Sequence, residues 1–150
     1  MFRGRFEHTI DDKGRVSVPA HFREQLQATS DDRLVITNFM IQSARCLDVY
    51  PFAAWVELEQ RMLAKPRFDQ RVLQFQNYYF AAAQDCSLDK QGRILLPVNL
   101  RQYAGLDRDI VFTAALEKFR IWDRQVWEQV FGQAERFLME RPQDLGELGV

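Results

Sequence analysis

The sequence is poor in the residue types that most enzymes and metalloproteins depend on, with two cysteines and two histidines in 150 residues. Cys46 and Cys86 stand alone, without the paired spacing of a zinc site or a disulfide framework. His8 and His21 have no carboxylate or cysteine at metal-ligand spacing. Neither a Ser–His–Asp nor a Cys–His arrangement can be assembled around two histidines near the N-terminus. We therefore expect no metal, no cofactor and no enzymatic activity, and we expect both thiols to be reduced and partly buried.

Long apolar segments and glycine-rich loops are also missing. No apolar run approaches the ~18 residues that a membrane-spanning helix needs. The opening residues 1–7 carry two arginines and a glutamate, which does not fit the apolar stretch of a secretory signal peptide. No glycine-rich phosphate-binding loop is present. We expect a cytoplasmic protein with no membrane partner and no evident small-molecule substrate.

An overall excess of positive charge is absent as well, since the formal net charge is −1. This value taken alone argues against a nucleic-acid partner. The distribution of charge changes that argument, because residues 1–27 contain five basic and four acidic side chains, whereas residues 107–150 contain six basic and nine acidic ones. Phosphate binding requires a local basic face and not a basic average. The sequence is therefore compatible with a nucleic-acid partner that contacts its N-terminal part and its duplicated turns.

One motif is present twice. Residues 10–23 return as residues 88–101, and equivalent residues are separated by 78 positions. The identical pairs are Asp11/Asp89, Gly14/Gly92, Arg15/Arg93, Pro19/Pro97 and Arg23/Arg101, and the apolar Val16 and Val18 recur as Ile94 and Leu96. Self-similarity at a fixed offset indicates an internal duplication. Two copies of a small unit, related by a pseudo-twofold axis, suit a two-sided or repeated target, and this favours binding over catalysis.

Local patterns predict an α+β fold with the same order of elements in both copies. Residues 5–10 alternate as a strand, residues 11–14 have turn chemistry, and residues 15–18 form the returning strand of a hairpin. Pro19 suits the first turn of a short helix over residues 19–27. The further predicted elements are a hairpin at 34–38 and 45–50, a helix over 51–62, a helix over 70–79 with Asp69 as its N-cap, a repeat of this order in the second copy, and a helix over 124–140.

The predicted organisation has two repeat units joined by a helix. The units are residues 1–68 and 85–141, with a connecting helix at 69–84 and a frayed tail at 142–150. Trp55, Leu58 and Met62 lie at helical spacing and are expected to pack in the core or at a subunit interface. The separation of equivalent residues falls to 72 between Trp55 and Trp127, so the first copy is longer, and we place the extra length at residues 28–46.

The repeated turns are the strongest candidates for a binding site. Gly14 and Gly92 permit tight turns that project Arg15 and Arg93 onto one face. We expect Lys13, Lys90, Arg3 and Arg5 nearby, which would complete a basic surface. A planar guanidinium can bind a phosphate or the O6/N7 edge of guanine with two hydrogen bonds. The alternative is that Asp11–Arg15 and Asp89–Arg93 are ion pairs across each turn that only hold the turn together.

Taken together, the doubled Asp-x-x-Gly-Arg-apolar-x-apolar-Pro unit, the opening Met1-Phe2-Arg3-Gly4 and the segment Phe80-Ala81-Ala82-Ala83 closely resemble the MraZ family of bacterial transcriptional regulators. More widely, each half resembles the AbrB/SpoVT swapped-hairpin DNA-binding unit. The resemblance covers nearly the whole chain. It implies two AbrB-like β-hairpin/helix units that form an intramolecular pseudo-dimer, a swapped-hairpin barrel, with flanking helices.

The resemblance also implies a function. Members of this family form ring-shaped homo-oligomers and bind tandem short repeats upstream of the operon that contains the division and cell-wall genes. Arg23 and Arg101 match a helix position that AbrB-type proteins use for DNA, although Glu24 follows Arg23 where a second arginine would be expected. The expected DNA-binding residues are Arg3, Arg5, Lys13, Arg15, Arg23, Lys90 and Arg93.

The resemblance thus implies a nucleoid-associated regulator, acting as a repressor, whose partners are double-stranded DNA and further copies of itself. The competing hypothesis is a ring-forming structural or protein-interaction scaffold that does not bind DNA.

Overall fold

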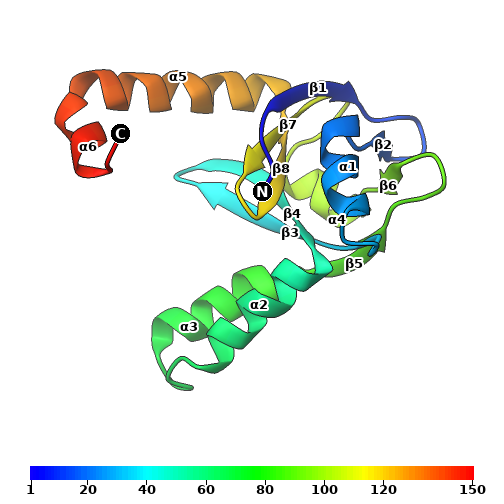
Figure 1. Ribbon diagram of the computed structural model, residues 1–150, viewed down its shortest axis with the longest axis horizontal. Coiled ribbons are helices and arrows are strands. Elements are labelled where there is room, and N and C mark those ends of the chain that lie inside the picture. The colour runs from blue at the N-terminus through cyan, green and yellow to red at the C-terminus, as the bar shows by residue number, and fades with distance from the viewer.

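The computed structural model describes residues 1–150 and has an α+β fold, built from antiparallel strands with helices around them (Figure 1). The strands are β1 (Arg5–Thr9), β2 (Arg15–Ser17), β3 (Arg33–Ile41), β4 (Ala44–Pro51), β5 (Gln84–Ser87), β6 (Arg93–Leu95), β7 (Asp109–Ala115) and β8 (Lys118–Asp123). The helices are α1 (Ala20–Gln27), α2 (Phe52–Leu63), α3 (Gln70–Phe75), the π-helical turn η1 (Gln76–Phe80), α4 (Val98–Tyr103), α5 (Arg124–Glu140) and α6 (Pro142–Glu147).

Six strands form one antiparallel sheet in the order β1-β7-β8-β4-β3-β5, and β2 pairs with β6 in a separate two-stranded ribbon. The hairpin predicted at 34–38 and 45–50 is confirmed as β3 and β4. Its counterpart in the second copy is β7 and β8. The β3–β4 hairpin is the longer of the two, which agrees with extra length within residues 28–46.

The strands on either side of each repeated turn do not pair with each other. β1 pairs with β7 of the second half, β5 pairs with β3 of the first half, and β2 pairs with β6. The predicted local pairing of residues 5–10 with residues 15–18 is therefore wrong. An isolated two-stranded hairpin is marginal in water. Exchange between the halves instead places Val16 opposite Ile94, and both side chains are buried in the shared core.

The exchanged pairings obey a pseudo-twofold axis. In the ribbon, Val16 faces its own counterpart Ile94. In the large sheet, Asp48 faces Arg120, which is its counterpart at the separation of 72. Each of these facing pairs therefore lies at the axis that relates the two copies.

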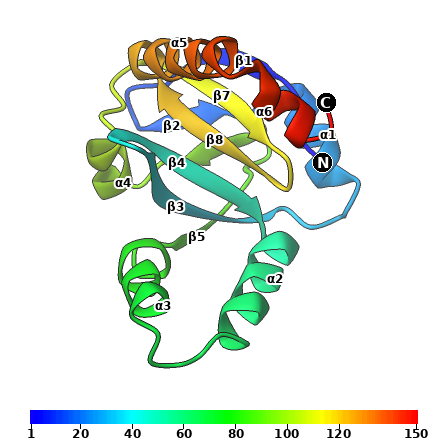
Figure 2. The same ribbon diagram turned by 90° about the vertical axis from the view of Figure 1, so that its left-hand side faces the viewer.

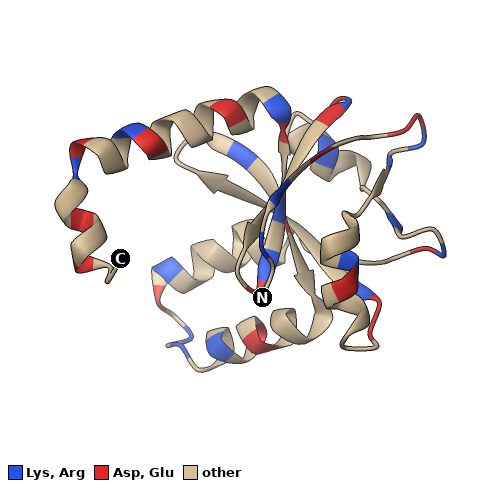
Figure 3. Cartoon of the chain, turned by 45° about the horizontal axis from the view of Figure 1, so that its top comes forward, with Lys and Arg blue, Asp and Glu red and all other residues tan.

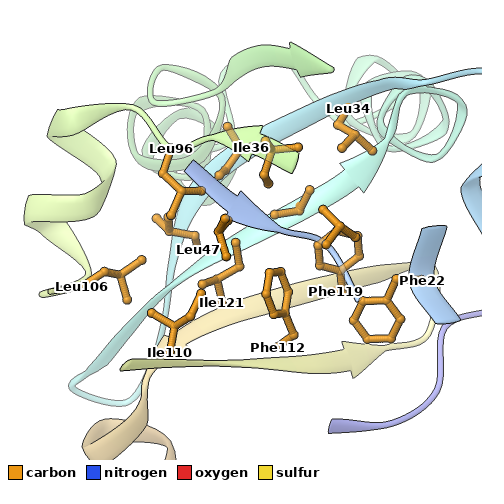
Figure 4. Close-up of a cluster of buried hydrophobic side chains, with 14 of the residues drawn as sticks. Phe22, Leu34, Ile36, Leu47, Leu96, Leu106, Ile110, Phe112, Phe119 and Ile121 are labelled. Carbon is orange, nitrogen blue, oxygen red and sulfur yellow. The ribbon is translucent and has the colours of Figure 1, made fainter. Parts of the chain in front are cut away.

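The main core lies between the sheet, the ribbon and helices α1 and α4, and it contains residues of both copies. Figure 4 shows Phe22 of α1 close to Phe112 and Phe119 of β7 and β8. Leu34 and Leu47 line the same cluster from the first half. Because one core serves both halves, the duplicated units fold together as one body.

A second apolar cluster holds the α2–α3 helix pair against the sheet. Trp55 and Leu58 of α2 are buried there beside Tyr79, as their spacing predicted, whereas Met62 is only partly buried. The helix pair projects from the sheet on the side away from the ribbon (Figures 1 and 2). The helix predicted over 70–79 begins at the expected N-cap, because the Asp69 side chain accepts a hydrogen bond from the Arg71 backbone N–H at 2.9 Å.

Asp48 is the buried charged residue of the sheet. Its side chain is inaccessible to solvent, accepts a 2.9 Å hydrogen bond from Arg120 Nε, and accepts another from the Tyr79 hydroxyl. Burial raises the pKa of Asp48, and the positive charge of Arg120 opposes that shift. The hydrogen bond to Asp48 holds Tyr79 close to the pseudo-twofold axis in the sheet, and Tyr79 belongs to the turn η1.

The C-terminal part agrees with the sequence up to residue 140 and differs after it. The helix expected over 124–140 is α5, and the Asp123 side chain caps its N-terminus. The expectation of a frayed tail from residue 142 is wrong, because residues 142–147 form α6. Pro142 occupies the first turn and Asp144 lies near the positive end of the helix dipole, and both placements favour a helix start.

Candidate nucleic-acid interface

The first turn, residues 11–15, is closed by a single carboxylate. Asp11 Oδ1 accepts hydrogen bonds from the backbone N–H groups of Lys13 at 2.9 Å and Arg15 at 2.8 Å. Asp11 Oδ2 accepts a bond from Arg15 Nε at 2.8 Å. Gly14 has a φ of +82°, which non-glycine residues rarely adopt. These contacts fix both the loop and the orientation of the Arg15 side chain.

The second turn, residues 89–93, repeats this arrangement. Asp89 Oδ1 accepts from the backbone N–H groups of Gln91 at 2.8 Å and Arg93 at 2.9 Å, and Oδ2 accepts from Arg93 Nε at 2.9 Å. Gly92 has a φ of +76°. The backbone hydrogen bonds from Arg15 and Arg93, followed by the side-chain bonds, hold the pKa of Asp11 and of Asp89 below the usual range.

Each ion pair uses only one edge of its guanidinium. The salt bridge joins Nε to the carboxylate, and the Nη atoms of Arg15 and Arg93 make no hydrogen bond within the chain. About a third of each side chain is exposed, 32% for Arg15 and 27% for Arg93. The ion pair therefore orients the side chain and leaves its outer nitrogens for a phosphate or a guanine edge. Holding the turn and binding a ligand are compatible roles for these arginines.

Each turn is supported by an arginine from the other half. A Cβ placed on Gly14 would lie 2.9 Å from Cζ of Arg101 in α4, and one on Gly92 would lie 2.5 Å from Cδ of Arg23 in α1. The Nε atoms of Arg23 and Arg101 are buried and have no hydrogen-bond partner in the chain. Glycine is thus favoured at both positions by its positive φ, and a side chain there would also displace the arginine that packs against the turn.

The ribbon of β2 and β6 lies between the two turns. Because side chains alternate along a strand, Val16 and Ile94 point into the core, and the neighbours on each strand point outward. The outward face consists of Arg15 opposite Leu95 and Ser17 opposite Arg93. The two arginines therefore occupy diagonal corners of one four-residue face.

The structure brings together some of the predicted site residues and separates others. Lys13 and Lys90 are exposed on the two turns, which extend from the same end of the molecule (Figure 3). Arg3 and Arg5 precede or begin β1, whereas the first turn follows its other end. The Arg5 guanidinium lies 5.6 Å from the centre of the Phe131 ring on α5. The expectation that Arg3 and Arg5 lie beside the turns is therefore wrong.

Sequence reasoning missed two features of this face. It did not anticipate that Arg23 supports the second turn and Arg101 the first. The sequence of a single repeat does not show that its strands pair with strands of the other repeat. It also did not distinguish Leu95 from its buried neighbours Ile94 and Leu96. Both could have been found by assuming strand exchange and then applying the alternation of side chains to the ribbon.

Outside the ribbon and its turns, an open hollow of about 480 Å³ lies between α2 and η1, with Met62, Leu63 and Phe80 among its lining residues. No three His, Cys, Asp or Glu side chains are grouped as a metal site would require. None of the helices has the length and apolar character needed to cross a membrane.

Comparison with known proteins identifies the family. The family model described as that of the MraZ protein matches residues 1–77 and again residues 79–145. A protein of Moorella thermoacetica named Transcriptional regulator MraZ is 45% identical over 131 residues, covering 86% of this chain and 85% of that protein. A protein of the same name from Desulfitobacterium hafniense is 41% identical over 150 residues, which is the whole of both chains. Another, from Thioalkalivibrio sulfidiphilus, is 42% identical over 127 residues, covering 85% of this chain and 83% of that protein. The chain therefore belongs to the MraZ family.

Proposed function

We propose that the chain is a transcriptional regulator that binds double-stranded DNA in a sequence-specific manner through the ribbon and its two flanking turns. The observation that carries the proposal is the pair of oriented arginines, Arg15 and Arg93, whose Nη atoms have no partner within the chain. Its relatives bear the name of a transcriptional regulator, which supports the same assignment.

The geometry suggests a role for each basic residue. A two-stranded ribbon fits the major groove of B-DNA, where an arginine can bind guanine O6 and N7 together. Lys13 and Lys90, exposed on the turns, are suited to phosphates on either side of the groove. Arg23 acts from beneath the second turn. Arg3 and Arg5 lie at the far end of β1, so we propose them only as contacts to flanking phosphates.

We further propose that the exchanged pairing of the two repeat units, 1–68 and 85–141, is the AbrB-type swapped-hairpin arrangement within one chain. In that arrangement the connecting segment 69–84 and the tail 142–150 lie outside the DNA-binding barrel. The protein would act in the cytoplasm at the nucleoid, without a cofactor and without catalysis.

The proposed target is a set of short tandem repeats upstream of the chain's own operon, in the division and cell-wall gene cluster, where binding represses transcription. A ring-shaped homo-oligomer would place several ribbons on successive repeats. Linked sites turn later binding events into local ones, with avidity gains of ~10²–10⁴. These gains would compensate for the small basic face of one protomer, whose formal net charge is −1.

Titration of a fluorescent duplex that carries the upstream region tests the proposal directly. We expect Arg15→Ala to lose specific binding while it keeps its thermal midpoint, because a solvent-accessible ion pair contributes little to stability. Arg71→Ala is the control, since Arg71 is likewise paired with an aspartate, Asp69, but lies on α3 away from the ribbon. An Arg15→Ala protein with wild-type affinity and wild-type salt dependence would reject the site.

The arrangement of repeats provides a second test. Repeats spaced by about one helical turn, roughly 10 base pairs, would present the same groove to successive protomers. Inserting about five base pairs between repeats rotates one site to the opposite side of the duplex and should strongly weaken binding. An array that tolerates this insertion would contradict the multivalent arrangement.

A non-enzymatic scaffold that forms rings without binding DNA remains the second candidate. It is favoured by the exposed apolar side chains of α5 and of the residue after α6, among them Phe137, Met139 and Leu148, which suit contacts between protomers. Light scattering distinguishes a closed oligomer from a monomer at micromolar concentration. An oligomer that shows no salt-dependent binding to the upstream duplex would favour the scaffold.

A further inference from the structure

We propose that Leu95 is a specificity-determining residue that contacts the 5-methyl group of a thymine, and that its difference from Ser17 gives the site of each protomer a direction. This inference rests on the proposed DNA-binding function. It assigns a role to a residue outside the predicted basic set.

Leu95 is the one apolar side chain on the outward face of the ribbon, and 60% of it is exposed. Its strand neighbours Ile94 and Leu96 are buried in the core, so alternation forces Leu95 outward. Exposed leucines are common on protein surfaces and by themselves need no explanation. The position of Leu95 is unusual because its facing residue is Arg15, one of the two oriented arginines.

The charges around Leu95 indicate what it contacts. The face it shares carries Arg15 and Arg93, and exposed Lys13 and Lys90 lie on the flanking turns. This positive surround complements phosphates and disfavours an apolar protein partner. In the major groove the apolar group that a base presents is the C5-methyl of thymine. An exposed leucine within this basic face is therefore suited to select thymine.

The register limits where that thymine can lie. Facing side chains on an antiparallel pair have Cβ atoms roughly 4.5–5.5 Å apart. Successive bases on a DNA strand are about 3.4 Å apart along the helix axis. The thymine contacted by Leu95 should therefore lie within about two base pairs of the base contacted by Arg15.

The pseudo-twofold axis gives this contact a second consequence. Arg15 and Arg93 are exchanged by the axis, so the arginines alone would recognise an inverted repeat. Ser17 and Leu95 are equivalent positions that differ in chemistry, so the two strands of the ribbon are not interchangeable. DNA repeats in head-to-tail order require a protein site whose two ends differ.

Thymine-to-deoxyuridine substitution tests the contact, because it removes only the methyl group. Each thymine of one repeat is replaced in turn, and affinities are measured for the wild type, Leu95→Ser and Val98→Ser. Val98 is the matched control, since it is 57% exposed and lies on α4, outside the ribbon. We expect one or two substitutions to weaken wild-type binding about fourfold each, the value for one buried methyl-sized group.

Leu95→Ser should bind the unmodified duplex more weakly and show no loss at those same positions, whereas Val98→Ser should keep the wild-type pattern. Equal thermal midpoints would show that the fold is intact. Wild-type binding that is insensitive to every substitution, or Leu95→Ser that keeps the sensitivity, would overturn the inference and leave the proposed function standing. A wild type that does not bind the unmodified duplex would overturn the proposed function, and this inference with it.

Discussion

Replacing Gly92 with alanine should destabilise the second turn by displacing Arg23 from beneath it. The added Cβ would lie 2.5 Å from Arg23 Cδ, and closer still to Nη1. Carbon atoms in contact are normally about 3.5–4.0 Å apart, so the arginine side chain must move by about 1 Å or more. Its buried Nε has no hydrogen bond to lose, and the cost is therefore one of packing and backbone strain.

The structure provides a control that separates these two costs. Gly105 has a φ of +64°, close to the +76° of Gly92, but a Cβ there meets no atom within 4 Å. Gly105→Ala therefore measures the left-handed backbone alone, about 1–2 kcal/mol. Gly92→Ala should add an overpacking cost of about 1–3 kcal/mol. For a chain of this length each kcal/mol lowers the thermal midpoint by roughly 2–4 °C.

Thermal or urea unfolding of the two variants, with and without Arg23→Ala, completes the test. In the Arg23→Ala background the clash is absent, and Gly92→Ala should cost no more than Gly105→Ala. Equal destabilisation by the two alanines in the wild-type background would show that Arg23 does not press on the turn. A penalty that persists after Arg23 is removed would show that some other contact causes it.

Two other predictions concern the acidic residues. Asp48→Ala removes a fully buried carboxylate and leaves the partly buried Arg120 side chain without its partner, so it should cost up to about 3–5 kcal/mol in urea unfolding. Asp31→Ala removes a partly exposed carboxylate that is paired with the exposed Arg33, and it should change stability far less. Because the folded state lowers the pKa of Asp11 and Asp89, their stabilisation should be complete above the unfolded value, about 3.9, and should be lost as the pH falls through the folded values. The gap in thermal midpoint between the wild type and the Asp11→Asn/Asp89→Asn double variant should narrow on acidification, and a constant gap would contradict this assignment.

Elements fixed by short-range patterns could be predicted from the sequence. The β3–β4 hairpin, α2 with its apolar spacing after Pro51, and α5 were all predicted from local sequence patterns. Each of these signals lies within a few residues of the element it determines. This is why the boundaries of α2 and α5 agree with the structure to within one residue.

Strand partners could not be predicted in the same way. Alternation over residues 5–10 specifies which face of β1 is buried, but it is equally consistent with pairing to β2 or to β7. The choice depends on how much apolar surface the whole chain buries, and pairing across the halves joins both repeats in one core. The same limit explains the misplaced Arg3 and Arg5, whose position depends on the partner of β1.

The candidate site was only partly visible for a related reason. Arg15 and Arg93 stood out because they recur with their aspartates at a fixed separation. Leu95 did not, because in the run Ile94-Leu95-Leu96 an exposed leucine looks like a buried one until a strand direction is known. A residue that functions in only one of the two copies cannot be recognised by its recurrence. It is visible only as a difference between the copies.

The differences between the two copies have a physical explanation in the pairing of strands across the halves. In a dimer of identical units, the residue on the axis faces a copy of itself, so Asp48 would face another aspartate, and two buried like charges repel. Within one chain the counterpart has become Arg120, and the axis holds a hydrogen-bonded ion pair that also binds Tyr79. In the ribbon, Ser17 and Leu95 are equivalent positions that do not face each other, and they too can differ without altering Arg15 or Arg93. Duplication within a chain thus allows equivalent positions to take different residues, both in the core of the sheet and on the face proposed to contact DNA.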